Sequence, residues 1–451
     1  MSRRLKGSVT IFLALLIMTF LMLCLVLVEG VRIYYLRVNA AQAMELAEFS
    51  ALSEYQRELF EHYGLFFLDL DYEQGSEQVG ILEGRLNHYL NKNIEEIQTE
   101  QLKVKNIHRA TDAEGKSFVE QAVSVMKMEK GSLFWEKLIE DFGHITPEDL
   151  NLGELLVKNE NVIETALDHL KEGEKNKVIS ISIPDVTFPS VKALRDAVFG
   201  EETALSEKSI DLSRSIQTRD LSKGEDQRKE NSFLDLGYFH RYLFQNFGYY
   251  GDKNPNVWDS SLEYQLEYMI SGKDHDLKNL ENVMWKIFLL RAGGNYLFYR
   301  QDSYYLGEAK AEAIAMVGFL GNPYLIEAVT EILLLSRAIE EGITQTRQVF
   351  LGEKVPLYEK GIFSGILLGY EEYLYLFLKT EKHEQVVYRC MDLVEREVRE
   401  QSKYEDFRLD HCTDRFEVQW NYQFDSLFHE TGYFTGEIYK NEINRKVFYE
   451  N

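Results

Sequence analysis

Side chains that could carry out chemistry are scattered along this sequence and form no recognised catalytic or metal-binding motif. The ten histidines are never three or four residues apart, so no helix would place two of them on one face. A phosphate-binding loop, a G-x-S-x-G nucleophile elbow, an H-E-x-x-H pair and a C-x-x-C pair are all absent. The densest group of metal-ligand types is His411-Cys412 between Asp410 and Asp414, and its spacing favours a loop-to-strand junction. We therefore predict no catalytic residue, no metal site and no cofactor.

Two acidic groups have the residue types for acid–base chemistry or calcium binding. Glu371 and Glu372 are adjacent, and adjacent residues on a helix point about 100° apart, which indicates a solvated helix edge. Asp69, Asp71 and Glu73 alternate like calcium ligands, but the glycine and the distal glutamate of an EF-hand loop are missing. We interpret this second segment as an acidic loop.

The longest uncharged stretch is the run of twenty residues from Val9 to Val28. At about 1.5 Å per residue it forms a helix of roughly 30 Å, the thickness of the hydrocarbon core of a bilayer. A secretory signal peptide has a shorter apolar core, about 7–15 residues, and a small-residue cleavage site directly after it. A lipoprotein site at Cys24 is disfavoured by the bulky Leu23 before it. The run predicts a retained membrane anchor, with apolar residues Val9, Ile11, Phe12, Leu13, Leu15, Leu16, Leu21, Leu25 and Val28.

Three basic residues and no acidic residue precede this run: Arg3, Arg4 and Lys6. By the positive-inside rule they hold the N-terminus in the cytoplasm. We expect a single-pass protein of the cell membrane, with the lipid bilayer as a partner and the C-terminal bulk extracytoplasmic. Cys390 and Cys412 could then form a disulfide, although two buried thiols are the favoured alternative.

The chain has 451 residues and a formal net charge of −24. A surface of this charge repels phosphate backbones, so we predict no nucleic-acid binding. The 27 Tyr, 27 Phe and only 6 Pro indicate packed globular structure, and the length favours two soluble domains. We divide the chain into a cytoplasmic tail (1–8), a transmembrane helix (9–29), a stalk helix with a mixed region (30–230) and a helix-rich domain with a small sheet (231–451).

The helical pattern continues beyond the apolar run, from Gly30 to about Tyr63, without a proline. Gly64 is a natural C-cap for this stalk helix. Uninterrupted helices of this length usually need a packing partner, and small residues allow one to approach closely. We therefore expect a partner protein to pack on the stalk. The small residues are Ala40, Ala41, Ala43, Ala47 and Ala51.

The rest of the sequence predicts many helices and a small antiparallel sheet. Alternating apolar residues predict strands at 101–107, 178–183, 261–270 and 416–424, and we expect the last two to pair. The polar segment 206–232 is our candidate linker. The predicted fold class is α+β, dominated by helix. Helical patterns cover residues 81–97, 117–142, 233–247, 276–299, 307–320, 324–341, 361–378 and 382–401.

The block Lys6-Gly-Ser-Val-Thr-Ile-Phe-Leu-Ala-Leu15 resembles the start of TadE/TadG-type pseudopilin-like proteins of tight-adherence (Tad/Flp) pilus systems. In those proteins a basic residue and a glycine precede a membrane helix, which continues into an alanine-rich helix outside the membrane. Asn39–Ala43 is similar in character to that continuation. The fifth residue after Gly7 is Phe12, where processed pilin subunits carry Glu, so the resemblance implies an uncleaved accessory protein.

The later sequence is similar to an uncharacterised bacterial family that is often grouped with those proteins. The similarity is found in Tyr55–Leu65, Leu262–Gly272, Leu320–Pro323 and Tyr404–Cys412. It implies a membrane-anchored component on the secreted side of the membrane, without catalytic residues.

Together these features favour a non-enzymatic component of a Tad/Flp-like pilus assembly or secretion apparatus. Its expected protein partners are membrane or pilus-assembly proteins, bound through the N-terminal helix. The alternative is a membrane-tethered envelope receptor or binding module unrelated to pili. An extracytoplasmic enzyme is a third class, because a convergent active site leaves no sequence motif.

Overall fold

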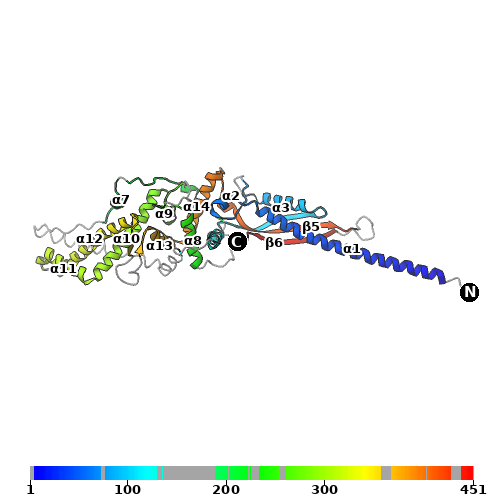
Figure 1. Ribbon diagram of the computed structural model, residues 1–451, viewed down its shortest axis with the longest axis horizontal. Helices are drawn as coiled ribbons and strands as arrows, with labels where there is room; N and C mark the ends of the chain where they lie inside the picture. The colour runs from blue at the N-terminus through cyan, green and yellow to red at the C-terminus, as the bar shows by residue number, and fades with distance from the viewer. Residues whose placement is uncertain are drawn as a thin grey trace. The chain divides into compact units, whose positions relative to one another are not determined.

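The beginning and the end of the chain fold together in the computed structural model (Figure 1). Unit 1 comprises residues 1–121, 221–228 and 398–451, and unit 2 comprises residues 122–220 and 229–397. The predicted division at residue 230 stays a prediction. The structure describes residues 5–72, 77–128, 135, 188–201, 203–221, 224, 233–252, 261–356, 367–402, 404–427 and 438–449; the predicted strand at 178–183 lies outside them.

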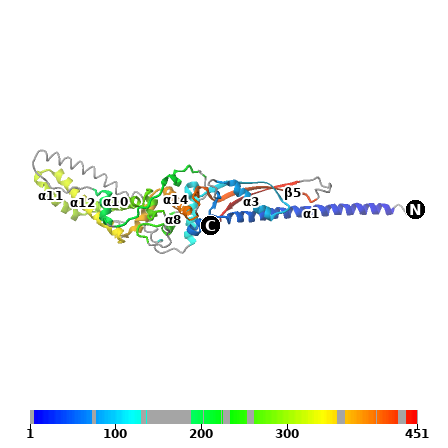
Figure 2. The same ribbon diagram turned by 90° about the horizontal axis from the view of Figure 1, so that it is seen from above.

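Unit 1 begins with the 48-residue helix α1 (Leu5–Leu52), which is continuous through the apolar run and into the stalk (Figures 1 and 2). It ends earlier than the predicted stalk. A turn follows, in which the Gln56 amide donates to the Phe67 carbonyl at 2.8 Å. The short helix α2 (Arg57–Tyr63) then ends at Gly64, whose φ of 69° is left-handed. The predicted C-cap is therefore confirmed, although it closes a separate helix.

The sheet of unit 1 is built around β5 (Cys412–Asp425). This strand pairs antiparallel with β1 (Leu68–Asp69), β2 (Gln98–Arg109) and β6 (Ile438–Phe448). The predicted strands at 101–107 and 416–424 are confirmed, and the α+β fold class with them. The expected pairing of 416–424 with 261–270 is wrong, because β2 and β6 occupy the positions beside β5.

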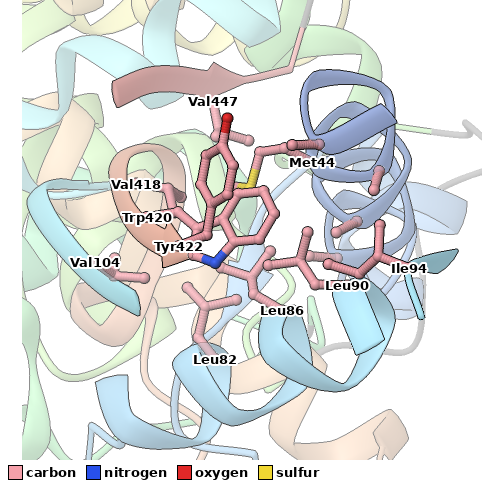
Figure 3. Close-up of a cluster of buried hydrophobic side chains, with 14 of the residues drawn as sticks. Met44, Leu82, Leu86, Leu90, Ile94, Val104, Val418, Trp420, Tyr422 and Val447 are labelled. Atoms are coloured by element: carbon pink, nitrogen blue, oxygen red, sulfur yellow. The ribbon is translucent and has the colours of Figure 1, made fainter. Parts of the chain in front are cut away.

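One face of this sheet packs against α1 and α3 (Val79–Asn93). Trp420 and Tyr422 lie at the centre of this core, between Met44 of α1 and the leucines of α3 (Figure 3). Every second residue of β5 is buried, as the alternation of its sequence predicts. The remaining described elements of unit 1 are η5 (Leu409–His411) and parts of two helices that cross the boundary between the units, the start of α4 (Asp112–Met128) and the last turn of α14 (His383–Ser402).

Among its described residues, the regular structure of unit 2 is helical apart from the short strands β3 (Val355–Pro356) and β4 (Leu367–Leu368). Its main core joins α7, α10, α11 and α12 around buried residues such as Phe288, Ala313 and Leu334. The Gly321-Asn-Pro323 turn joins α11 to α12, as predicted. The helices are α7 (Val191–Phe199), η2 (Leu212–Arg214), η3 (Ile216–Thr218), α8 (Phe233–Asn246), α9 (Gln265–Ser271), α10 (Asp276–Gln301), α11 (Ser303–Val317), η4 (Gly318–Leu320), α12 (Pro323–Phe350), α13 (Tyr370–Thr380) and α14 (His383–Ser402).

One prediction for unit 2 is wrong. Residues 265–271 form the helix α9 and not a strand. The described part of the candidate linker is packed against the unit, because Ile216 is fully buried and Arg219 forms an ion pair with the buried Glu395. The boundaries between the units at 220/221 and 228/229 both fall within the candidate linker, so a linker in its remaining residues stays a prediction.

The core of unit 1 gives a direct test of this arrangement. Leu86→Ala removes a fully buried side chain that contacts the β5 aromatic residues, and we expect the free energy of unfolding to fall by about 2–5 kcal/mol. Asn91→Ala, at an exposed position of the same helix, should change it by roughly 0.5 kcal/mol or less. Urea unfolding of the full chain in detergent, followed by hydrogen exchange of β5 peptides, measures both. Equal losses would contradict the buried position of Leu86.

Candidate membrane-anchor and helix interface

The apolar run forms the first half of α1, and its side chains are exposed apart from the half-buried Cys24. The exposed set includes every predicted anchor residue from Val9 to Val28. The Thr19 hydroxyl donates to the Leu16 carbonyl at 2.9 Å, so this polar group is satisfied within the helix. Within the described ranges, α1 alone is long and apolar enough to cross a membrane, a property that signal sequences share. It is compatible with a membrane anchor.

The sheet of unit 1 attaches to α1 directly after the apolar run ends. Both carboxylate oxygens of Glu29 accept from the Leu427 amide, at 3.2 and 3.3 Å. One turn later Arg32 donates to the Asp425 carbonyl at 2.8 Å and to the Glu96 carboxylate at 3.0 Å. The first two charged side chains after Val28 are thus bound to the sheet end and to the residues before β2. The predicted orientation residues Arg3, Arg4 and Lys6 have side chains outside the described set.

Beyond this attachment α1 has two different faces. The inner face is built from small and flexible residues (Leu36, Ala40, Ala43, Met44, Ala47 and Ala51) and is buried against α3 and the sheet. Four of the five predicted small residues therefore pack inside this chain, and only Ala41 is exposed. The outer face carries larger apolar residues, and the exposed ones are Val31, Tyr34, Tyr35, Val38, Leu46 and Phe49.

The inner face also carries one buried acid, Glu48. Its carboxylate lies 3.3 Å from the Arg445 guanidinium of β6, while the more exposed Glu45 lies 3.8 Å from the same group. One oxygen of Glu48 is buried without a hydrogen bond. Burial raises the pKa of Glu48 to about 7, against the opposing effect of Arg445, so the charged carboxylate is unfavourable in this contact.

The structure brings together Asp71 and His411, which belong to two separate groups in the sequence. Asp71 is fully buried, and its carboxylate lies 2.6 Å from Nδ1 of His411. The Leu70 amide also donates to the His411 carbonyl, so the contact fixes the end of β1 against η5. In the part of the chain that the structure describes, no group of three or more acidic, histidine or cysteine side chains is arranged to hold a metal ion.

The other predicted chemistry residues lie apart from one another. Glu371 accepts from the Tyr249 hydroxyl at 2.7 Å, whereas Glu372 accepts from the Gly369 amide at 2.9 Å. Glu372 is buried, so its assignment to a solvated helix edge is wrong. Cys390 and Cys412 are both buried, and neither is in a disulfide.

The sequence pattern does not single out two buried carboxylates of unit 2. Glu267 is fully buried and accepts from the Tyr370 hydroxyl at 2.6 Å, and burial raises its pKa to about 7. Asp392 accepts from the Ile216 amide and the Tyr268 hydroxyl, and burial raises its pKa to about 6. A charge at the polar position of an alternating or helical pattern is normally solvated, so no signal in one sequence indicated their burial.

The contact between α1 and β6 makes stability depend on pH. The folded-state pKa of Glu48 lies above the ordinary value of 4.5, so between pH 4.5 and 7 the folded protein binds more protons than the unfolded chain. This group therefore stabilises the fold less as pH rises. We expect Glu48→Gln to raise the free energy of unfolding by about 1–2 kcal/mol at pH 8 and to change it little at pH 5.

Glu45→Gln is the matched control, because Glu45 faces the same arginine from an exposed position. It should leave the pH dependence nearly unchanged. Thermal unfolding of both variants and the parent chain from pH 5 to pH 8 makes the comparison. Parallel curves for the parent and Glu48→Gln would contradict this account of the contact.

The comparisons with known proteins place most of the described unit 2 and β5 in one family. A family model described as a family of unknown function (DUF5702) matches residues 158–362 and 358–424. No curated protein and no solved structure matches the chain. The expected membership in an uncharacterised family is confirmed, and the match says nothing of Tad/Flp pili. The chain belongs to the family of unknown function DUF5702.

Proposed function

We propose that this chain is a non-enzymatic, single-pass, membrane-anchored component of a Tad/Flp-like pilus assembly or secretion apparatus. Its N-terminus is cytoplasmic, and unit 2 and the part of unit 1 that follows the apolar run are extracytoplasmic. It acts by lateral packing of α1 against a helix of a neighbouring protein. The observation that carries this proposal is a set of large exposed apolar side chains that continues along the outer face of α1 past the attachment of the sheet, beside the exposed polar residues Arg37, Gln42 and Glu45.

The exposure of this face is large for residues of these types. Phe49 is 75% exposed and Leu46 is 53% exposed, on a helix whose other face is fully packed. Burying such side chains yields about 25 cal/mol per Å² of apolar surface. Contiguous apolar surface on a soluble unit is typical of a binding face. The inner face of α1 thus packs against the rest of unit 1, and the outer face is the one proposed to pack against a partner.

The sequence near the membrane supports the more specific assignment. Lys6-Gly7-Ser8 precedes the apolar run, and the helix continues unbroken into the alanine-bearing segment, as the resemblance to TadE/TadG-type proteins implies. Phe12 replaces the acid of processed subunits, which supports a retained anchor. Arg3, Arg4 and Lys6 support the cytoplasmic N-terminus.

Photo-crosslinking in cells tests the lateral contact. A photoreactive phenylalanine analogue replaces Val38 or Phe49, and each should form an adduct with a helix of a membrane or pilus-assembly protein, identified by mass spectrometry. Lys103 of β2 is the control, because it is exposed on the solvated face of the sheet. Adducts at Val38 and Phe49 that do not exceed those at Lys103 would contradict lateral packing. Adducts only with proteins unconnected to pili or secretion would favour the receptor alternative.

Protease protection tests the orientation. A C-terminal tag should be digested when protease is added to intact protoplasts, whereas an N-terminal tag should resist until the membrane is permeabilised. The physical reason is the positive charge before the apolar run, which remains on the cytoplasmic side. Full protection of the C-terminal tag would show that the orientation is reversed.

A further inference from the structure

The part of α1 that exposes no charge is longer than the apolar run. Glu29 is only 8% exposed and Arg32 is half-buried, because both are bound to unit 1. The first exposed charged side chain after the run is Arg37. From Val9 to Leu36 the helix rises about 42 Å, at about 1.5 Å per residue. This is about 12 Å more than the hydrocarbon core of a bilayer requires.

The additional length is sufficient to cross a headgroup layer. A bilayer is about 40–45 Å thick with its headgroups and about 30 Å thick without them, so one headgroup layer is about 5–8 Å. The exposed side chains in this part of α1 are Val31, Tyr34 and Tyr35. Tyrosine is enriched at membrane interfaces because its ring is apolar and its hydroxyl is polar.

The end of the sheet lies beside this same part of α1. Asp425, the carbonyl partner of Arg32, is paired with Ile438 across β5 and β6, and Leu427 donates to Glu29. Both apolar side chains here are exposed, Leu427 at 48% and Ile438 at 47%. In Figures 1 and 2 the N-terminal half of α1 extends past this end of the sheet. Residues 428–437 are outside the described set and are not part of the surface considered.

We infer that Val31, Tyr34, Tyr35, Leu427 and Ile438 form a membrane-facing rim, with which unit 1 sits in the lipid headgroup layer of the leaflet it emerges from. This inference rests on the proposed anchor role of α1. The binding of Glu29 and Arg32 to the sheet end pairs two charges that α1 would otherwise expose at the level of the headgroups, where Glu96 and Asp425 stay exposed. The rim then contacts lipid through apolar and tyrosine side chains, and no flexible segment separates unit 1 from the bilayer.

Fluorescence quenching in lipid nanodiscs tests the rim. Single cysteines at Leu427 and Ile438 of the full chain carry an environment-sensitive fluorophore, in a Cys24→Ser background in which Cys390 and Cys412 are buried. The matched control is Phe448→Cys, because Phe448 is 44% exposed and ends the same strand, about 33 Å from Ile438. Phosphatidylcholine with a nitroxide on the headgroup should quench the probes at 427 and 438 at least twofold more than the probe at 448.

A probe in the apolar run separates the two proposals. Leu21→Cys should be quenched by nitroxide on the acyl chains if α1 is a membrane anchor. Quenching at 21, with equal and weak headgroup quenching at 427, 438 and 448, would overturn the rim and leave the anchor standing. No quenching at 21 would overturn the anchor and the rim with it.

Discussion

The structure of unit 1 depends on the pairing of Glu29 and Arg32 with the end of the sheet. These charges follow an apolar run of twenty residues without a break in the helix. A carboxylate and a guanidinium at this point need hydrogen-bonding partners, and the Leu427 amide, the Asp425 carbonyl and the Glu96 carboxylate supply them. The attachment therefore fixes where the sheet begins along α1. It also determines which turns of the helix face protein and which remain exposed.

Beyond this attachment the two faces of α1 differ in the residue types they carry. The inner face uses alanine and methionine, so α3 and β5 can approach closely and bring Trp420 and Tyr422 against the helix. The outer face uses valine, leucine and aromatic residues, which present much more apolar area per residue. A helix that only supported the sheet would carry mainly polar residues there, whereas this face carries six large apolar residues beside the exposed Arg37, Gln42 and Glu45. The two proposed contacts, lipid near the attachment and a partner helix farther along, would account for the large apolar residues of the outer face.

The sequence predicted the elements whose apolar residues recur with a long, regular period. It missed elements in which polar residues are buried together with apolar ones. The helix at 276–299 and the strand at 416–424 were predicted within a few residues, since one face of each is apolar. In residues 261–270 the apolar alternation is also present, yet Gln265 and Glu267 are buried as fully as their apolar neighbours. Where polar and apolar positions are equally buried, the alternation of apolar and polar residues does not identify a strand. The spacing of four between Tyr264, Tyr268 and Gly272 was the helical signal, because Gly272 is the left-handed C-cap of α9.

For the candidate site the sequence predicted the long helix but not the use of its faces. The three- and four-residue steps identified both a large-residue stripe and a small-residue stripe. The occupant of the small-residue stripe is α3 together with a strand more than 350 residues away, β5, and one sequence cannot show a contact of that separation. The β6 strand was missed because its inward positions include Asn441 and Arg445, which interrupt the apolar alternation expected of a half-buried strand.

The part of the chain that matches the family model includes a strand whose buried face packs against α1. The matched residues 158–424 lie mostly in unit 2, but they include β5 almost to its end. The buried face of β5 carries Phe416, Trp420 and Phe424, which pack in one core with α1, with α3 and with residues of the neighbouring strands. Without that cover three aromatic side chains would be exposed, each burying roughly 150–250 Å² when packed. A chain that contains β5 with this sequence therefore also needs a helix that buries its apolar face. In this chain the helix that does so is the one that carries the apolar run.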